Sequence, residues 1–153
     1  MDTSVVSLEE HKKKDFVNPE VADIRVEWDS VKPGIEAILA ASPQLTFLPE
    51  DVYSECVNGR ATLLVSPAGF LVLTTEVDTF TGDRTLLIWL AYRYANSTNS
   101  WLDHVEWFEE VARTLECKFI EMRSTLPKME AYARRNGWKL DARVFTREVR
   151  NGQ

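Results

Sequence analysis

Hydrophobic and polar positions change period several times along this chain, most clearly in its second half. Residues 84–91 form a mostly apolar run that suits a buried strand and is too short to span a membrane. A polar loop follows, and residues 101–115 then carry apolar side chains at helical spacing. Residues 118–122 predict a short strand, and a further amphipathic helix closes at Gly137-Trp138.

The first half predicts a strand, two helices and a hairpin. Residues 24–28 alternate like a half-buried strand, and Asp29 or Ser30 can cap a helix that ends at Ser42-Pro43. A second helix is expected to begin at Pro49 and to stop at Asn58-Gly59. Residues 60–66 and 70–77 predict a hairpin, and a turn at residues 81–83 leads into the run at 84–91.

The last third predicts a capped helix and a final strand. Ser124 or Thr125 is expected to cap the helix, with Pro127 near its start and Gly137 at its end. Residues 141–149 then predict the last strand, which a short strand from Trp138 could precede.

Composition indicates one soluble domain of 153 residues with 44% hydrophobic side chains. The net charge of −6 argues against a protein whose main task is binding nucleic acid through its phosphates. The basic residues near the C-terminus read as a solvated rim, although a local basic patch stays open: Arg134, Arg135, Lys139, Arg143, Arg147 and Arg150.

Cys56 and Cys117 have no metal-like spacing, so we interpret them as free thiols in a reducing compartment, and we expect no metal site. The chain shows no apolar run of membrane-spanning length and no signal sequence at its start. We therefore expect a cytoplasmic location, or incorporation into a particle assembled there.

Residues 1–20 predict an N-terminal arm, because a mixed charge run and Asn18-Pro19 leave little to bury. A frayed tail explains this composition. The alternative is a segment that becomes ordered on a protein partner through Val5, Val6, Leu8, Phe16 and Val17.

The order of elements over residues 21–149, with a four-residue tail at 150–153, resembles the GNAT superfamily of N-acetyltransferases. That resemblance implies an α/β (α+β) fold with a mixed, mostly antiparallel sheet flanked by about four helices. The chain also resembles small GNAT-like proteins of tailed bacteriophages, in its Pro49–Val52 helix start, its Gly69-Phe70 strand, its 86–92 strand and its Gly137-Trp138 pair.

The resemblance implies a site for acetyl-CoA beside the strand at 84–91. Its pantetheine arm would pair with Leu90, Ala91 and Tyr92, and Arg93 could face the pyrophosphate. The family's glycine-containing loop signature falls on Asn96, Asn99 and Trp101, and all three positions depart from it. Glycine matters there because phosphate oxygens must approach main-chain N–H groups closely. The full candidate loop is Asn96, Ser97, Thr98, Asn99, Ser100 and Trp101, which an ordinary polar connection capped by Ser100 also explains.

The catalytic positions depart from the family as well. The family's tyrosine acid falls on Ala133, whereas Tyr132, one residue earlier, suits core packing or, on a rotated helix, a role as acid. Glu76 and Asp78 are candidate bases, with solvated surface carboxylates as the alternative. His104 suits a solvent-facing or satisfied histidine better than a catalytic one.

Two hypotheses follow. The first is a GNAT-fold protein of bacteriophage type with a degenerate cofactor loop, which needs no cofactor and binds a protein, as a virion-associated component or an interaction factor. The second is an active acetyl-CoA-dependent N-acetyltransferase with a non-standard loop. Neither involves a membrane, and nucleic-acid binding is the weakest reading because the net charge opposes it.

Overall fold

The computed structural model describes residues 17–94, 101–124 and 127–150, apart from the side chains of Leu102, Pro127 and Lys128. Most of the expected arm at 1–20, the candidate loop residues 96–100 and the candidate cap Thr125 therefore lie outside the described residues. The chain divides into two compact units, Met1–Arg123 and Ser124–Gln153.

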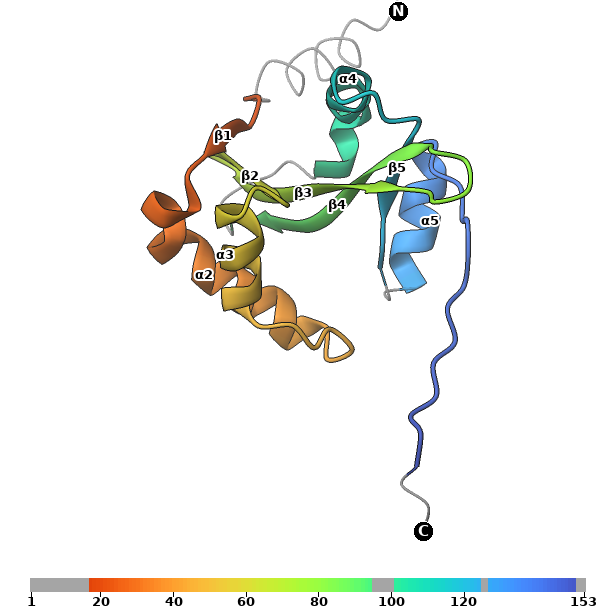
Figure 1. Ribbon diagram of the computed structural model, residues 1–153, viewed down its shortest axis with the longest axis horizontal. Coiled ribbons are helices and arrows are strands. Elements are labelled where there is room, and N and C mark those ends of the chain that lie inside the picture. The colour runs from red at the N-terminus through yellow and green to blue at the C-terminus, as the bar shows by residue number, and fades with distance from the viewer. Residues whose placement is uncertain (1–16, 95–100, 125–126, 151–153) are drawn as a thin grey trace, which may run out of the picture. The chain divides into compact units, whose positions relative to one another are not determined.

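One five-stranded sheet organises the first unit (Figure 1). Its strands follow chain order across the sheet, and every neighbouring pair is antiparallel except the last, which is parallel. The strands are β1 (Glu20–Ala22), β2 (Thr62–Ser66), β3 (Gly69–Val77), β4 (Arg84–Arg93) and β5 (Phe119–Met122). The expected mixed, mostly antiparallel sheet is thus confirmed, including the β2–β3 hairpin and the turn before β4.

The expected strand at residues 24–28 is wrong, because these residues begin helix α2 (Ile24–Ala41). Asp23 caps that helix, its Oδ1 accepting a hydrogen bond from the Arg25 N–H at 2.9 Å, so Asp29 and Ser30 lie inside the helix rather than at its start. The buried positions Ile24, Val31 and Ile35 lie on one helical stripe. Five alternating residues fit either period, and the longer stripe decides the outcome.

Helix α3 (Pro49–Val57) confirms the prediction at both ends. Pro49 stands in the first turn, and Asp51 Oδ2 accepts a hydrogen bond from the Leu48 N–H at 2.7 Å. The Asn58 N–H donates to the Ser54 oxygen, and Gly59 has a φ of +73°, a left-handed conformation that suits glycine.

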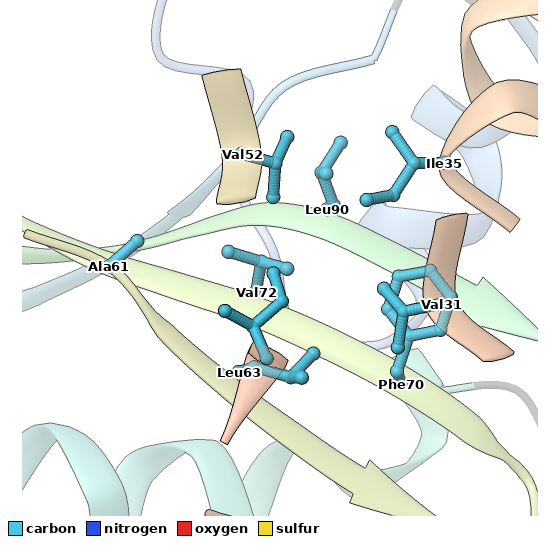
Figure 2. Packing of buried hydrophobic residues seen from close by; sticks show 9 residues of the cluster. Val31, Ile35, Val52, Ala61, Leu63, Phe70, Val72 and Leu90 are labelled. Atoms are coloured by element: carbon cyan, nitrogen blue, oxygen red, sulfur yellow. The ribbon is translucent and has the colours of Figure 1, made fainter. Parts of the chain in front are cut away.

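A hydrophobic core fills the space between α2, α3 and one face of the sheet (Figure 2). Val31 and Ile35 meet Phe70 and Val72 there, all of them fully buried. The remaining members of the cluster are Ile24, Val52, Ala61, Leu63 and Leu90. Burial of side chains of this size contributes roughly 1.5–3 kcal/mol each, so this layer holds the first unit together.

The other face of the sheet is covered by a helical segment that begins as a 3₁₀ turn, η1 (Trp101–His104), and continues as α4 (Val105–Thr114). In Figure 1, α4 lies on the opposite side of the sheet from α2 and α3. Phe108 and Ala112 are its buried residues. The predicted helix at 101–115 is confirmed, except that its first turn is not α-helical.

The second unit contains α5 (Pro127–Arg135) and an irregular extended segment, residues 138–150. The predicted end of the helix at Gly137 is confirmed: its φ is +83°, and the Trp138 N–H donates to the Ala133 oxygen at 2.9 Å. The expected strand at 141–149 is wrong. No ladder forms along it, and Val144, Phe145 and Val149 are each more than 80% exposed.

Candidate functional site

The candidate site is the end of β4, where the sheet loses its last strand. β4 pairs with β5 only from Thr85 to Ile88, which lies opposite Met122. β4 then continues to Arg93 with β3 as its only described neighbour. The two parallel strands therefore separate along the sheet, and one edge of β4 opens over its last five residues.

A β-bulge marks the point of separation. Ile88 lies opposite Leu73 and Leu90 lies opposite Val72, so Trp89 is an extra residue on β4. A bulge bends its strand and increases the local twist, which turns β4 away from the line of β5. It also lets the successive residues Trp89 and Leu90 both pack on the α2–α3 core, where the Trp89 ring lies 5.3 Å from the ring of Phe47.

Alternation along β4 decides which main-chain groups face the open edge. The Tyr94 N–H donates to the Ala68 oxygen across the hairpin, so the main-chain groups of Tyr92 and Leu90 also face β3. The groups of Ala91 and Arg93 therefore point toward the open edge, and both residues are exposed. Of the three residues expected to pair with a pantetheine arm, only Ala91 has its main-chain N–H and C=O groups at the open edge. The main-chain groups of Arg93 lie at this edge as well.

Tyr92 and Leu90 contribute to the core instead. Leu90 is 3% exposed, and the Tyr92 ring stacks on Phe70 with centroids 5.4 Å apart. Tyr92 also meets Tyr94 edge-on at 5.9 Å, and burial raises the pKa of Tyr94. Gly34 leaves room for this stack, because a Cβ there would lie 2.5 Å from Phe70 Cε1 and 2.8 Å from Tyr92 Cδ1.

Trp101 joins the start of the helical segment to the end of β4. Its side chain is buried, with 8% exposed, and its indole Nε1 donates a hydrogen bond to the Tyr92 main-chain oxygen at 3.1 Å. The ring therefore fills the space between this strand end and the first turn of the helical segment. The sequence predicts the position and the bulk of this residue but not its hydrogen bond.

The first turn of this segment is poorly suited to an anion. Residues 101–104 form a 3₁₀ turn, and α4 begins only at Val105, after His104, which provides no side-chain cap. The turn also carries the Asp103 carboxylate, whose negative charge opposes an anion at the positive end of a helix. Burial lowers the pKa of His104, although Asp103 acts in the opposite direction, so the histidine adds little positive charge at neutral pH.

The two candidate bases have structural partners. Glu76 lies 3.1 Å from Arg123 Nη2, which also binds Glu121 at 2.7 Å, so it belongs to an exposed ion-pair group. Asp78 Oδ1 accepts hydrogen bonds from the N–H groups of Phe80 and Thr81. These bonds lower the pKa of Asp78, which makes it a weaker base.

The remaining candidates fall outside this arrangement. Tyr132 lies on α5 in the second unit, where the Arg135 guanidinium lies 5.8 Å from its ring centre and its main-chain oxygen accepts a bond from Asn136. Cys56 and Cys117 are free thiols, as expected. Among the described residues, no cluster of histidine, cysteine or carboxylate side chains could hold a metal ion, and no helix is long and apolar enough to cross a membrane.

In sequence, the chain matches no protein-family model and no curated protein. In structure it is similar to several solved acetyltransferases. A probable acetyltransferase superposes with a TM-score of 0.67 and 12% identity, over 88% of this chain and 100% of the other. A ribosomal-protein-alanine N-acetyltransferase from Brucella melitensis biovar Abortus 2308 superposes with a TM-score of 0.65 and 10% identity, over 87% of this chain and 100% of the other. A possible acetyltransferase from Clostridium difficile 630 superposes with a TM-score of 0.65 and 12% identity, over 88% of this chain and 98% of the other.

The fold is of the GNAT type. If acetyl-CoA, the cofactor that the sequence resemblance implies, lay along the open β4 edge, the described residues would fit only part of it. The main-chain groups of Ala91 and Arg93 suit an amide-bearing arm. The buried Trp101 indole, the 3₁₀ turn and Asp103 do not suit a diphosphate at the helix start.

Proposed function

We propose that this GNAT-fold protein acts by binding another protein, of the kind that serves tailed bacteriophages as a virion-associated component or an interaction factor, and transfers no acetyl group. The observation that carries the proposal is the buried indole of Trp101, bonded to the end of β4. A cofactor diphosphate at the helix start would have to displace this ring and break its hydrogen bond. Candidate surfaces for a protein partner include the arm at residues 1–20.

Titration calorimetry with acetyl-CoA tests the proposal, with thermal unfolding as a second readout. We expect no saturable heat and no stabilisation, whereas a ligand at one hundred times its Kd would stabilise the folded state by about 2.7 kcal/mol. In Trp101→Gly the ring is removed, and weak saturable binding is expected to appear. Trp28→Gly removes an equally large ring from α2, where the ring packs against Tyr53, and it serves as the matched control. Saturable binding by the wild-type protein contradicts the proposal.

Protein binding needs its own measurement. Where the protein is incorporated into purified phage particles, or captures a defined partner, deletion of residues 1–16, which stops before β1, is expected to abolish that association and leave the fold intact. Unchanged incorporation after the deletion would remove the arm from the proposal. If the protein is absent from purified particles and captures no protein partner, the proposed binding role is refuted.

A second candidate function, N-acetyl transfer, is favoured by one observation: the edge of β4 at Ala91 and Arg93 is open beyond the bulge at Trp89. Ala91→Pro discriminates between the two functions, because proline removes an N–H from the open edge and leaves the bonds to β3 in place. If acetyl-CoA pairs with this edge, the variant weakens its binding and slows thiol release with amine-bearing acceptors. If the protein only binds a partner, neither wild type nor variant releases the thiol.

A further inference from the structure

The edge of β4 beyond the bulge presents main-chain N–H and C=O groups in a regular array. β5 pairs with β4 only as far as Ile88, and the strand then continues along β3 to Arg93. Because Tyr92 and Leu90 direct their main-chain groups to β3, those of Ala91 and Arg93 point outward. Both residues are exposed, and no other described strand pairs with them. The outward groups match the main chain of one more extended strand.

Three contacts hold this end of β4 in its extended form. The Tyr94 N–H donates to the Ala68 oxygen at 2.8 Å, and the Trp101 indole donates to the Tyr92 oxygen at 3.1 Å. The Tyr92 ring also stacks on Phe70. An edge that is already ordered loses little conformational entropy on binding, so more of the hydrogen-bond energy appears as affinity.

We propose that the open edge of β4 binds an extended segment of a partner protein, which pairs with Ala91 and Arg93 as a short added β-strand. The inference rests on the proposed function, since a protein that binds no cofactor leaves this edge available. Main-chain hydrogen bonds supply the affinity of an added strand, and its side chains supply the specificity. Arg93 is exposed on the sheet face away from α2 and α3, so the segment carries an acidic side chain beside it.

The length of the edge favours a single segment over a second copy of this chain. The open part runs from Trp89 to Arg93, about 16 Å of strand at roughly 3.3 Å per residue. Within it, only Ala91 and Arg93 direct their main-chain groups outward, each with one N–H and one C=O. A stable dimer buries about 1,600 Å² in total, far more than contact along two such short edges provides. The edge therefore fits a short extended peptide.

Amide hydrogen exchange on the full chain, followed by NMR, tests whether the edge is open. The amides of Ala91 and Arg93 are expected to exchange much faster than the amide of Tyr92, which is bonded to β3. If all three amides are equally protected, another part of the same chain occupies the edge and the proposal is wrong.

A displayed library of random dodecapeptides is the probe, because the proposal specifies the chemistry of the segment and not its sequence. Peptides selected on the wild-type protein are synthesised and titrated by fluorescence anisotropy. We expect saturable binding, an acidic residue common to the peptides, and new protection of the Ala91 and Arg93 amides with no change at Tyr92. Ala91→Pro removes one outward N–H and is expected to weaken binding at least about tenfold.

Arg93→Glu leaves the main chain unchanged, and its reversed charge is expected to weaken binding of the same peptides. Arg25→Glu makes the same charge change at an exposed position of α2, and this matched control should bind like the wild type. Circular dichroism checks the fold of each variant. Should Ala91→Pro fail to fold, Arg93→Glu and the protected amides of the wild type decide the result.

Three outcomes overturn the proposal: no peptide binds; Ala91→Pro and Arg93→Glu bind the peptides as well as the wild type does; or bound peptide protects other amides and leaves these two unchanged. Pantetheine, which carries amides without a diphosphate, is titrated in parallel. Its saturable binding, with no peptide bound, would overturn the proposal by assigning the edge to a cofactor arm. The proposed function fails separately, through saturable binding of acetyl-CoA to the wild type.

Discussion

The indole N–H of Trp101 donates a hydrogen bond to the main-chain oxygen of Tyr92, 3.1 Å away, and so joins the first residue of the η1–α4 segment to the end of β4. A loop separates the two residues in sequence. In the structure they are in direct contact, and Trp101 is only 8% exposed. The contact closes the region where a GNAT-type fold would receive the diphosphate of a cofactor. The same contact therefore stabilises the fold and stands in the way of cofactor binding.

Removal of this contact in two steps separates packing from hydrogen bonding. Trp101→Phe keeps a ring and loses the donor, and it is expected to lower the free energy of unfolding by about 1 kcal/mol. Trp101→Ala removes the ring and is expected to cost about 3–5 kcal/mol. Urea unfolding followed by circular dichroism measures both. Equal stability of Trp101→Phe and wild type would show that the bond contributes nothing in solution.

Gly34→Ala is expected to destabilise the protein by about 1–3 kcal/mol. In an exposed helix this change would stabilise by about 1 kcal/mol, because alanine is the better helix former. Here the new methyl group meets Phe70, which is fully buried and cannot move aside. Ser30→Ala, at an exposed position of the same helix, is the control and should leave stability within about 0.5 kcal/mol of wild type. A stabilised Gly34→Ala would contradict the packing described for Phe70 and Tyr92.

Asp78→Ala is expected to lower stability at pH 7, because two N–H groups of the β3–β4 turn lose their acceptor. The folded-state pKa of Asp78 is lowered, so its contribution is present above its ordinary pKa of 3.8 and is lost as the pH falls through the lower folded value. The difference between variant and wild type should therefore narrow in acid. Thermal melts from pH 7 to pH 2 measure it. Thr79→Ala, at an exposed position of the same turn and without an ionisable group, should show no such narrowing.

Cys56 is expected to be almost inert to thiol reagents in the folded protein. Burial raises its pKa from 9.0 to about 11, which leaves roughly one hundredth of the usual thiolate at pH 8. Its reaction with a disulfide reagent should therefore be about 100-fold slower in buffer than in urea. The raised pKa also favours the folded state below pH 9, and this contribution is lost as the pH rises towards 11. Single-cysteine variants, Cys117→Ser and Cys56→Ser, assign the rates, and equally fast reaction of both thiols would refute the burial of Cys56.

Sequence reasoning located most elements because their ends carry residues with a single structural role. Pro49 and Gly59 delimit α3, and Gly137 ends α5. It failed at residues 24–28, where a short alternation could not reveal that the same residues belong to a longer helical stripe. It also failed at 141–149, because a strand exists only through a neighbour, and no property of the segment itself states whether that neighbour is present.

The sequence predicts where the candidate site lies but not how its main-chain groups are arranged. The position of Trp101 at the start of a helix follows from the sequence, and so does its conflict with a phosphate. The extra residue at Trp89 has no signature in the sequence, because a bulge is defined by the register of two strands. Which backbone groups face the open edge depends on that register, so Leu90 and Tyr92 could not be separated from Ala91 in advance.

The bulge at Trp89 reverses which side chains of β4 face the α2–α3 layer. Side chains at even-numbered positions point away from the α2–α3 layer as far as Ile88 and towards it from Leu90 onward. An insertion or deletion of one residue between the bulge and Arg93 would therefore move core side chains such as Leu90 to the opposite face of the sheet. Natural variants of this chain are expected to change length in the turns at either end of β4 and to keep its own length constant.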